Sequence, residues 1–111
     1  MSNTESNIFS SIVPLSANGF FAPIQFEDAI AFSVADVSFV ADTNCEITIR
    51  QSTDQINITN TETHSTTSNN PIQLQIALYS RYFQLSINNL ENVNQNIFSL
   101  QTIYKRNSIS I

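Results

Sequence analysis

Alternation of apolar and polar residues is the clearest pattern in the second half of the chain. Side chains at alternate positions of a strand face opposite sides, so this pattern predicts strands with one face in a core and the other in water. Three segments follow it strictly, at 72–78, 82–88 and 97–102. Their predicted inward residues are Ile72, Leu74, Ile76, Leu78, Phe83, Leu85, Ile87, Phe98 and Leu100. We expect the stretch 74–104 to form the centre of the fold.

The first half alternates less regularly. Residues 8–15 carry apolar side chains on both parities and predict a strand that ends at Pro14. Residues 20–28 predict a short edge strand and a corner. In 31–39 the alternation changes phase near Ala35 and Asp36, which favours a β-bulge, because one extra residue restores the inward face. A further strand is expected from Cys45 to Gln51.

Turns and loops separate these segments. Gly19, which follows Asn18, is the only glycine and is expected to adopt a positive φ. Residues 52–55 predict a turn stabilised by Ser and Asp side chains. Ile56 and Ile58 predict a short strand that continues to Thr61. Residues 59–70 contain no apolar side chain and are interpreted as the longest exposed loop. Residues 88–96 predict a long connection, with Leu90 and Val93 packed against one end of the core.

The segments described above amount to about eight strands and no helix. They predict an all-β fold, a single two-sheet antiparallel β-sandwich that is jelly-roll-like. Ile, Val, Thr, Phe and Tyr supply 41 of 111 residues, and these types are enriched in strands. We expect a flexible N-terminal arm at 1–7, the sandwich at 8–104 and a C-terminal arm or edge strand at 105–111. Ile109 and Ile111 alternate with serines there, so this tail is either a frayed end or an arm that adds to a neighbour's sheet.

The charge and polarity of the chain limit the classes of partner that we expect it to bind. Ser, Asn, Thr and Gln supply 47 residues against 13 charged ones, and a surface of low charge density has little self-repulsion, which favours a homo-oligomer. The net charge of −5 argues against binding to nucleic acid or to an anionic membrane. No apolar run is long enough for a membrane span, and the start of the chain lacks the features of a signal peptide.

Candidate chemistry is sparse, so we expect no enzyme, no cofactor and no metal site. His64 is the only histidine and Cys45 the only cysteine, too few for a zinc cluster. Cys45 is interpreted as a small buried residue. Glu27 and Asp28 are adjacent on an extended stretch, would point apart and are interpreted as a solvated corner.

Arg81 is the most informative charged residue. We expect its guanidinium to pair with an acid such as Asp36 or Glu46, or to stack on Tyr79 or Tyr82. Other candidate contact residues lie in the predicted loop and the C-terminal segment: His64, Lys105, Arg106, Ile109 and Ile111.

Three segments together resemble a known family. These are Ile47–Asp54, which ends in Ser-Thr-Asp, then Arg81–Asn89, which begins with Arg-Tyr-Phe, and Phe98–Thr102, which reads Phe-Ser-Leu-Gln-Thr. The pattern is similar to the β-sandwich (jelly-roll-like) structural domain of large double-stranded DNA virus or phage capsid and appendage proteins. Two positions depart from it: Phe26 replaces a Trp at the acidic corner, and Gln55 replaces the Gly that often follows the Asp. The second departure puts the tight-turn geometry in doubt.

The resemblance implies a virion structural protein: a minor capsid, penton or fibre/spike-base component that is synthesised in the host cytoplasm and packs against other capsid or appendage proteins. It carries over no catalytic residue. The alternative is a discoidin- or lectin-like module that binds a glycan or receptor, which predicts an exposed Tyr79, Tyr82 or Tyr104 beside a groove. An enzyme remains the third alternative and requires acids or His64 to converge in a pocket.

Overall fold

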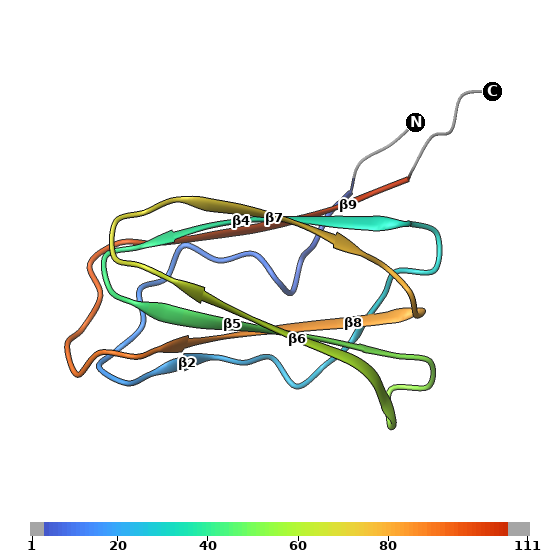
Figure 1. The fold of residues 1–111 in the computed structure, drawn as a ribbon, viewed down its shortest axis with the longest axis horizontal. Coiled ribbons are helices and arrows are strands. Elements are labelled where there is room, and N and C mark those ends of the chain that lie inside the picture. Colours follow the sequence, from blue (N-terminus) through green and yellow to red (C-terminus); the bar gives the residue numbers. More distant parts are fainter. Residues whose placement is uncertain (1–3, 107–111) are drawn as a thin grey trace.

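The computed structural model describes residues 4–106, which form two antiparallel β-sheets packed face to face (Figure 1). No helix occurs in this part of the chain, and the predicted all-β sandwich is confirmed. Three strands have two residues each, and six are longer. Their bounds are β1 Thr4–Glu5, β2 Phe20–Phe21, β3 Glu27–Asp28, β4 Val34–Ala41, β5 Cys45–Ser52, β6 Ile58–Thr66, β7 Ile72–Ala77, β8 Tyr82–Asn89 and β9 Phe98–Lys105.

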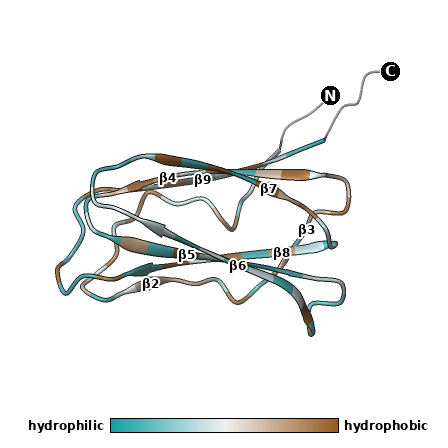
Figure 2. Ribbon diagram, viewed as in Figure 1, coloured by the Kyte–Doolittle hydropathy of each residue, from teal (hydrophilic) through white to brown (hydrophobic). Residues whose placement is uncertain are grey.

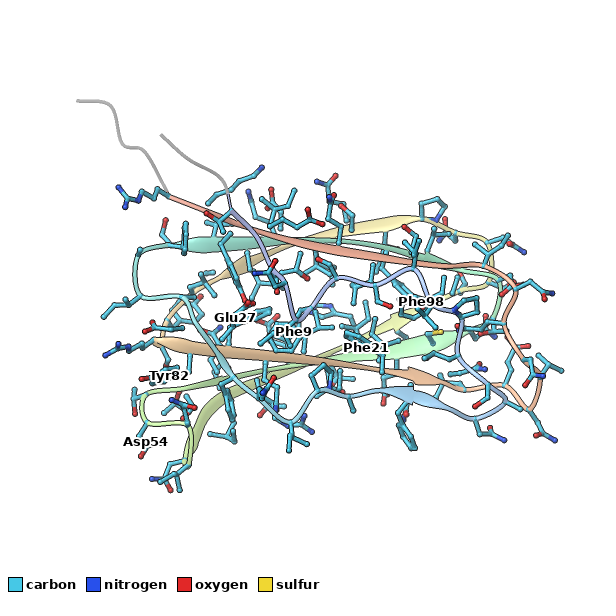
Figure 3. The ribbon with its side chains drawn as sticks, turned by 180° about the vertical axis from the view of Figure 1, so that it is seen from behind. Phe9, Phe21, Glu27, Asp54, Tyr82 and Phe98 are labelled. Atoms are coloured by element: carbon cyan, nitrogen blue, oxygen red, sulfur yellow. The ribbon has the colours of Figure 1, made fainter. Side chains whose placement is uncertain are left out.

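The strands are divided between two sheets, A and B. Sheet A has the order β1-β9-β4-β7, and sheet B has the order β2-β8-β5-β6, with β3 also paired to β8. The central pairs β4–β9 and β5–β8 each extend over eight residues without a register shift. On one side of the sandwich the outer strands are β6 and β7. On the opposite side lie the three short strands and the irregular N-terminal third of the chain (Figures 1 and 3).

The core lies between the sheets and is made by the alternating residues that the sequence predicted. Phe83, Leu85 and Ile87 of β8 are at most 1% exposed, and Phe98, Leu100 and Thr102 of β9 are also buried. Cys45 is fully buried at the start of β5, as expected. The hydropathy colouring shows apolar stretches alternating with polar ones along the long strands (Figure 2).

Aromatic rings fill one part of this core. Phe9 meets Phe83 edge-on, with ring centroids 5.6 Å apart, and Phe83 meets Tyr104 in the same way at 5.6 Å. Edge-to-face contacts are the favoured geometry for such pairs. Phe9 is fully buried although it belongs to no strand, so the N-terminal segment is part of the core and closes one side of it (Figure 3).

Several predictions about local structure were wrong. Residues 8–15 form no strand, only an isolated bridge between Ser11 and Leu100. The predicted short strand ending at Thr61 is part of β6, but β6 continues to Thr66 through residues interpreted as loop, because side chains on both of its faces are polar. No bulge interrupts β4 at Ala35 and Asp36, where the pairing with both neighbours is continuous. A register shift occurs instead between Gln51 and Ser52.

Two further corrections concern loops. Asn18, not Gly19, adopts the positive φ, at 53°; an Asn side chain tolerates this conformation better than most residues. A side chain at Gly19 would lie only 2.7 Å from the Ser16 hydroxyl, so lack of space explains the glycine. Leu90 and Val93 do not pack on the core but are 51% and 53% exposed, because the 90–97 connection is held by polar side chains.

Candidate functional site

Arg81 lies at one end of the sandwich, where three connections meet: residues 29–33, 53–57 and 78–81. We name this region the Arg81 end. Register places it there, since Ser52 pairs with Tyr82 in sheet B, and Val34 pairs with both Ala77 and Lys105 in sheet A. Most of the sequence-predicted contact residues are therefore brought to the same end of the molecule.

A buried amide positions the 78–81 connection. Gln51 is 1% exposed; its Oε1 accepts hydrogen bonds from the Tyr79 and Ser80 N–H groups at 2.8 and 3.1 Å, and its Nε2 donates to the Ala77 carbonyl at 2.9 Å. From outside, the Ser80 hydroxyl lies 2.7 Å from that of Thr59 on β6. The loop that presents Tyr79 and Arg81 is thus attached to both neighbouring strands of sheet B.

Arg81 forms an ion pair with Asp28, not with Asp36 or Glu46 as expected. Its Nε and one terminal nitrogen both donate to Asp28 Oδ2, at 3.1 and 2.7 Å. The hydrogen bond from Arg81 lowers the pKa of Asp28 and raises the pKa of Arg81. The guanidinium carbon also lies 5.2 Å from the centre of the Tyr82 ring, within the range of a cation–π contact, as predicted.

Asp54 organises the 53–57 turn. Its Oδ1 accepts from the N–H groups of Ile56 and Asn57 at 2.9 and 2.7 Å, and these hydrogen bonds hold the pKa of Asp54 well below its usual range. Gln55 adopts a φ of 68°, the left-handed conformation for which glycine is favoured. The tight turn therefore forms with glutamine at this position, supported by the hydrogen bonds to Asp54.

A hollow of about 280 Å³ opens beside the 78–81 connection. Tyr79 is 76% exposed and Ile30 is 67% exposed, and both line the hollow together with Arg81. Of the three tyrosines, Tyr104 is buried and Tyr82 is half-buried. Tyr79 is thus the one aromatic ring among the tyrosines that stands freely beside a depression, as a module for glycan binding would require.

The remaining predicted residues are distributed differently. His64 lies on edge strand β6 and pairs with Glu62, with 3.1 Å between Nε2 and Oε2. Lys105 forms an ion pair with the buried carboxylate of Asp36. Arg106 is exposed at the end of β9. Ile109 and Ile111 lie outside the described residues.

Glu27 and Asp28 do point apart, but Glu27 is not simply solvated. The Tyr104 hydroxyl donates to Glu27 Oε1 at 2.7 Å, and the Ser6 hydroxyl donates to the same oxygen. Burial and the adjacent carboxylate raise the pKa of Tyr104. Ser6 Oγ also accepts from the Phe9 N–H at 2.8 Å, so this cluster connects β1, β3 and β9 (Figure 3). Sequence reasoning missed it, because its members are far apart in the chain.

The opposite end of the sandwich holds a polar cluster that was also missed. We name it the amide end; it contains Thr43, Asn89 and Gln95, all buried. Asn89 Nδ2 donates to the carbonyls of Ser16 and Val93, each at 2.9 Å, and its Oδ1 accepts from the Thr43 hydroxyl at 2.8 Å. Gln95 Nε2 donates to the same hydroxyl at 2.9 Å. The richness of residues 88–96 in Asn was the only sequence signal.

Within residues 4–106, no group of three or more His, Cys, Asp or Glu side chains is placed to hold a metal ion. No helix in that range could cross a membrane. The described residues instead present exposed side chains, hydrogen-bonding groups and several hollows.

No protein-family model and no curated protein matches the chain. Among solved structures, the crystal structure of the PBSX exported protein XepA is similar over 99% of this chain, with a TM-score of 0.79 and 17% sequence identity. The chain spans 39% of XepA. At this identity the similarity shows a shared β-sandwich fold and extends to essentially the whole chain.

Proposed function

We propose that the chain is a phage-related structural or exported protein, and more specifically a virion component such as a minor capsid, penton or fibre/spike-base domain. The observation that carries this proposal is the similarity in fold to an exported protein of the phage PBSX. A sequence resemblance to virion structural domains points to the same class of protein. It depends on the segments around Ser52–Asp54, Arg81–Asn89 and Phe98–Thr102 and is independent of the fold similarity.

The surface chemistry supports a role in packing against other proteins. Apolar side chains at both ends are more than half exposed, including Ile12, Val13 and Phe20 near the amide end and Ile30, Ile56 and Tyr79 at the Arg81 end. Uncharged polar residues far outnumber charged ones in the chain, 47 against 13. Such surfaces bury apolar area at low electrostatic cost when copies or partners assemble. The proposal assigns no reaction and no cofactor to the chain.

Its test is to locate the protein in particles. Particles purified from the cells that encode the chain would be analysed by quantitative mass spectrometry and by gold labelling with an antibody against it. We expect a fixed ratio to the other particle proteins that is maintained through density-gradient purification. Protein that stays entirely in the particle-free fraction would overturn the virion role.

A second function, glycan binding, is favoured by one observation: exposed Tyr79 beside the hollow at the Arg81 end. Aromatic rings stack on sugar faces, and Arg81 and Ser80 could supply hydrogen-bonding groups at the rim. A glycan array would be probed with the purified protein and with Tyr79→Ala. Binding that is lost in the variant would support this function, and an array without signal for the unchanged protein would contradict it.

A further inference from the structure

Two strand edges are exposed on the same side of the sandwich, those of β6 and β7 (Figure 1). On the opposite side the N-terminal segment protects the edges. There β2 and β3 are two-residue strands separated by Pro23, and β9 is covered by β1 and by the bridge at Ser11. Proteins protect exposed edges because unpaired N–H and C=O groups can pair with another chain. The two unprotected positions are therefore those where a partner strand could add.

β6 carries an acidic side chain that disfavours such addition. Glu62 pairs with Ile49, and because Ile49 faces the core, the Glu62 carboxylate points inward at the edge, beside His64. Inward-pointing charges are one way in which natural edge strands resist pairing, since a neighbouring sheet would bury them. The register shift at the start of β6 also interrupts the regular ladder.

β7 has none of these features. Its six residues, Ile-Gln-Leu-Gln-Ile-Ala, include no charge, proline or glycine, and its pairing with β4 has no irregularity. Its inward residues Ile72 and Leu74 are only half-buried at the open side. A strand that pairs with β7 would cover these side chains as well as complete the sheet.

The hydrogen-bond pattern identifies which backbone groups of β7 point away from β4 and are available for pairing with another strand. Leu78 N–H donates to the Ser33 carbonyl at 2.9 Å, which extends the β4–β7 register by one pair. Antiparallel residues alternate between bonding to one neighbour and to the other. Leu78, Ile76 and Leu74 therefore bond towards β4, and Gln73 and Gln75 direct their N–H and C=O groups outward. Consistent with this alternation, the Ala77 carbonyl accepts from Gln51.

We propose that β7 pairs antiparallel with β7 of a second copy of this chain about a two-fold axis at Leu74. In this register Gln73 is opposite Gln75 of the other copy, so the two outward-facing residues form the hydrogen-bonded pairs. Ile72 is then opposite Ile76, so that apolar residues meet on the inner face and glutamines on the outer face. Both subunits thus contribute the same strand, with matching side chains on each face of the sheet, as the interface of an isologous dimer requires.

Charge also favours a second copy at this edge. Two molecules with a net charge of −5 repel one another, so they can approach only where the charge is low or balanced. β7 is neutral, and the nearest carboxylate in its partner strand, Asp36, is paired with Lys105. The joined sheets A would form one continuous sheet with the order β1-β9-β4-β7-β7-β4-β9-β1.

This inference deepens the proposed function by assigning one of its assembly contacts, and it rests on that function. Sedimentation equilibrium would be measured for the full chain and for two edge variants, Gln75→Lys and Gln75→Pro. In the proposed register the two introduced lysines lie diagonally across the two-fold axis on the same face and repel one another, and proline removes an outward N–H without affecting the bond to β4. Ser99→Lys is the matched control, because it adds the same charge to the outer face of sheet A on β9, which β4 separates from β7.

We expect the unchanged chain and Ser99→Lys to dimerise alike, and each Gln75 variant to raise the dissociation constant at least tenfold. A thermal unfolding scan of each variant shows that the fold is retained. Amide hydrogen exchange should show concentration-dependent protection at Gln73 and Gln75 and none along β6. A monomer at the highest soluble concentration, or protection at β6 instead, would overturn the β7 pairing. In that case detection of the chain in purified particles would still support the proposed function.

Discussion

The two ends of the sandwich are stabilised in opposite ways. At the amide end, buried side chains from two connections and the end of β8 form hydrogen bonds to one another and to the backbone, with Asn89 at the centre. At the Arg81 end, the buried amide of Gln51 and the Ser80–Thr59 contact hold the loop, and the Arg81–Asp28 pair is exposed. A buried network is costly to disturb because every lost partner leaves another group unsatisfied, whereas exposed pairs exchange with water. The difference indicates a rigid end and an adaptable end.

The largest effect is expected from Asn89→Ala at the amide end. The change leaves the Thr43 hydroxyl and the Ser16 and Val93 carbonyls without this partner, and we expect a loss of about 3 kcal/mol in the free energy of unfolding. Urea denaturation measures it. The control is Asn88→Ala, because the Asn88 Oδ1 is buried without a hydrogen-bond partner and its loss should matter little. Equal losses in the two variants would contradict the special role of the amide end.

A smaller effect is expected from Gln51→Leu at the Arg81 end. Leucine keeps the apolar bulk but removes two accepted hydrogen bonds and one donated one, for a loss of about 2 kcal/mol. Because the Tyr79 and Ser80 N–H groups then lose their acceptor, amide exchange at these two residues should accelerate more than elsewhere. Gln84→Leu serves as the control, since that side chain bonds only to the carbonyls of Pro23 and Ile24 on the outer face.

A still smaller effect at the same end depends on pH. The folded state lowers the pKa of Asp54, so its ionised form stabilises the turn above the ordinary pKa of an aspartate, and this contribution is lost as pH falls through the folded pKa. Asp54→Asn should flatten the acid limb of the stability curve while the turn persists. Urea denaturation at several pH values tests this, and an acid limb identical to that of the unchanged chain would show that Asp54 contributes nothing to it.

The smallest effect is expected from the Arg81–Asp28 pair. Both side chains are more than 40% exposed, and both nitrogens of Arg81 bond to the same carboxylate oxygen, which gives a weaker geometry than two parallel bonds. A double-mutant cycle with Arg81→Gln and Asp28→Asn should give a small favourable coupling that decreases with salt. A coupling as large as the loss in Asn89→Ala would mean that the Arg81 end is not the adaptable one.

Sequence patterns predicted the strands that have one buried face. The alternation in β7, β8 and β9 was sufficient, because half of each strand is apolar and half is polar. Only the start of β6 was predicted, as the short strand that ends at Thr61. The rest was interpreted as loop because its inward residues Glu62 and His64 are as polar as its outward threonines, which leaves no alternation of hydropathy. Its high threonine content, which favours strands, was the available signal.

Polar clusters were less predictable than strands. The sequence indicated that Arg81 pairs with an acid, but its partner Asp28 is 53 residues away and was not predicted, and Tyr104 reaches Glu27 across 77 residues. Such contacts depend on sheet order, which the alternation pattern does not contain. The amide end was missed for the same reason: Asn89 and Gln95 read as loop residues in sequence, and only the fold brings them to Thr43.

The pairing of β1 with β9 has a consequence for how this sandwich can be combined with other chains. Thr4 lies opposite Tyr104, so the chain enters and leaves the fold side by side at the Arg81 end (Figure 1). Domains with adjacent ends tolerate insertion into loops of larger proteins and circular permutation, because the host backbone is hardly displaced. Behind that junction the Ser6 and Tyr104 hydroxyls both donate to Glu27, so side-chain hydrogen bonds to β3 reinforce the backbone pairing that joins the two ends.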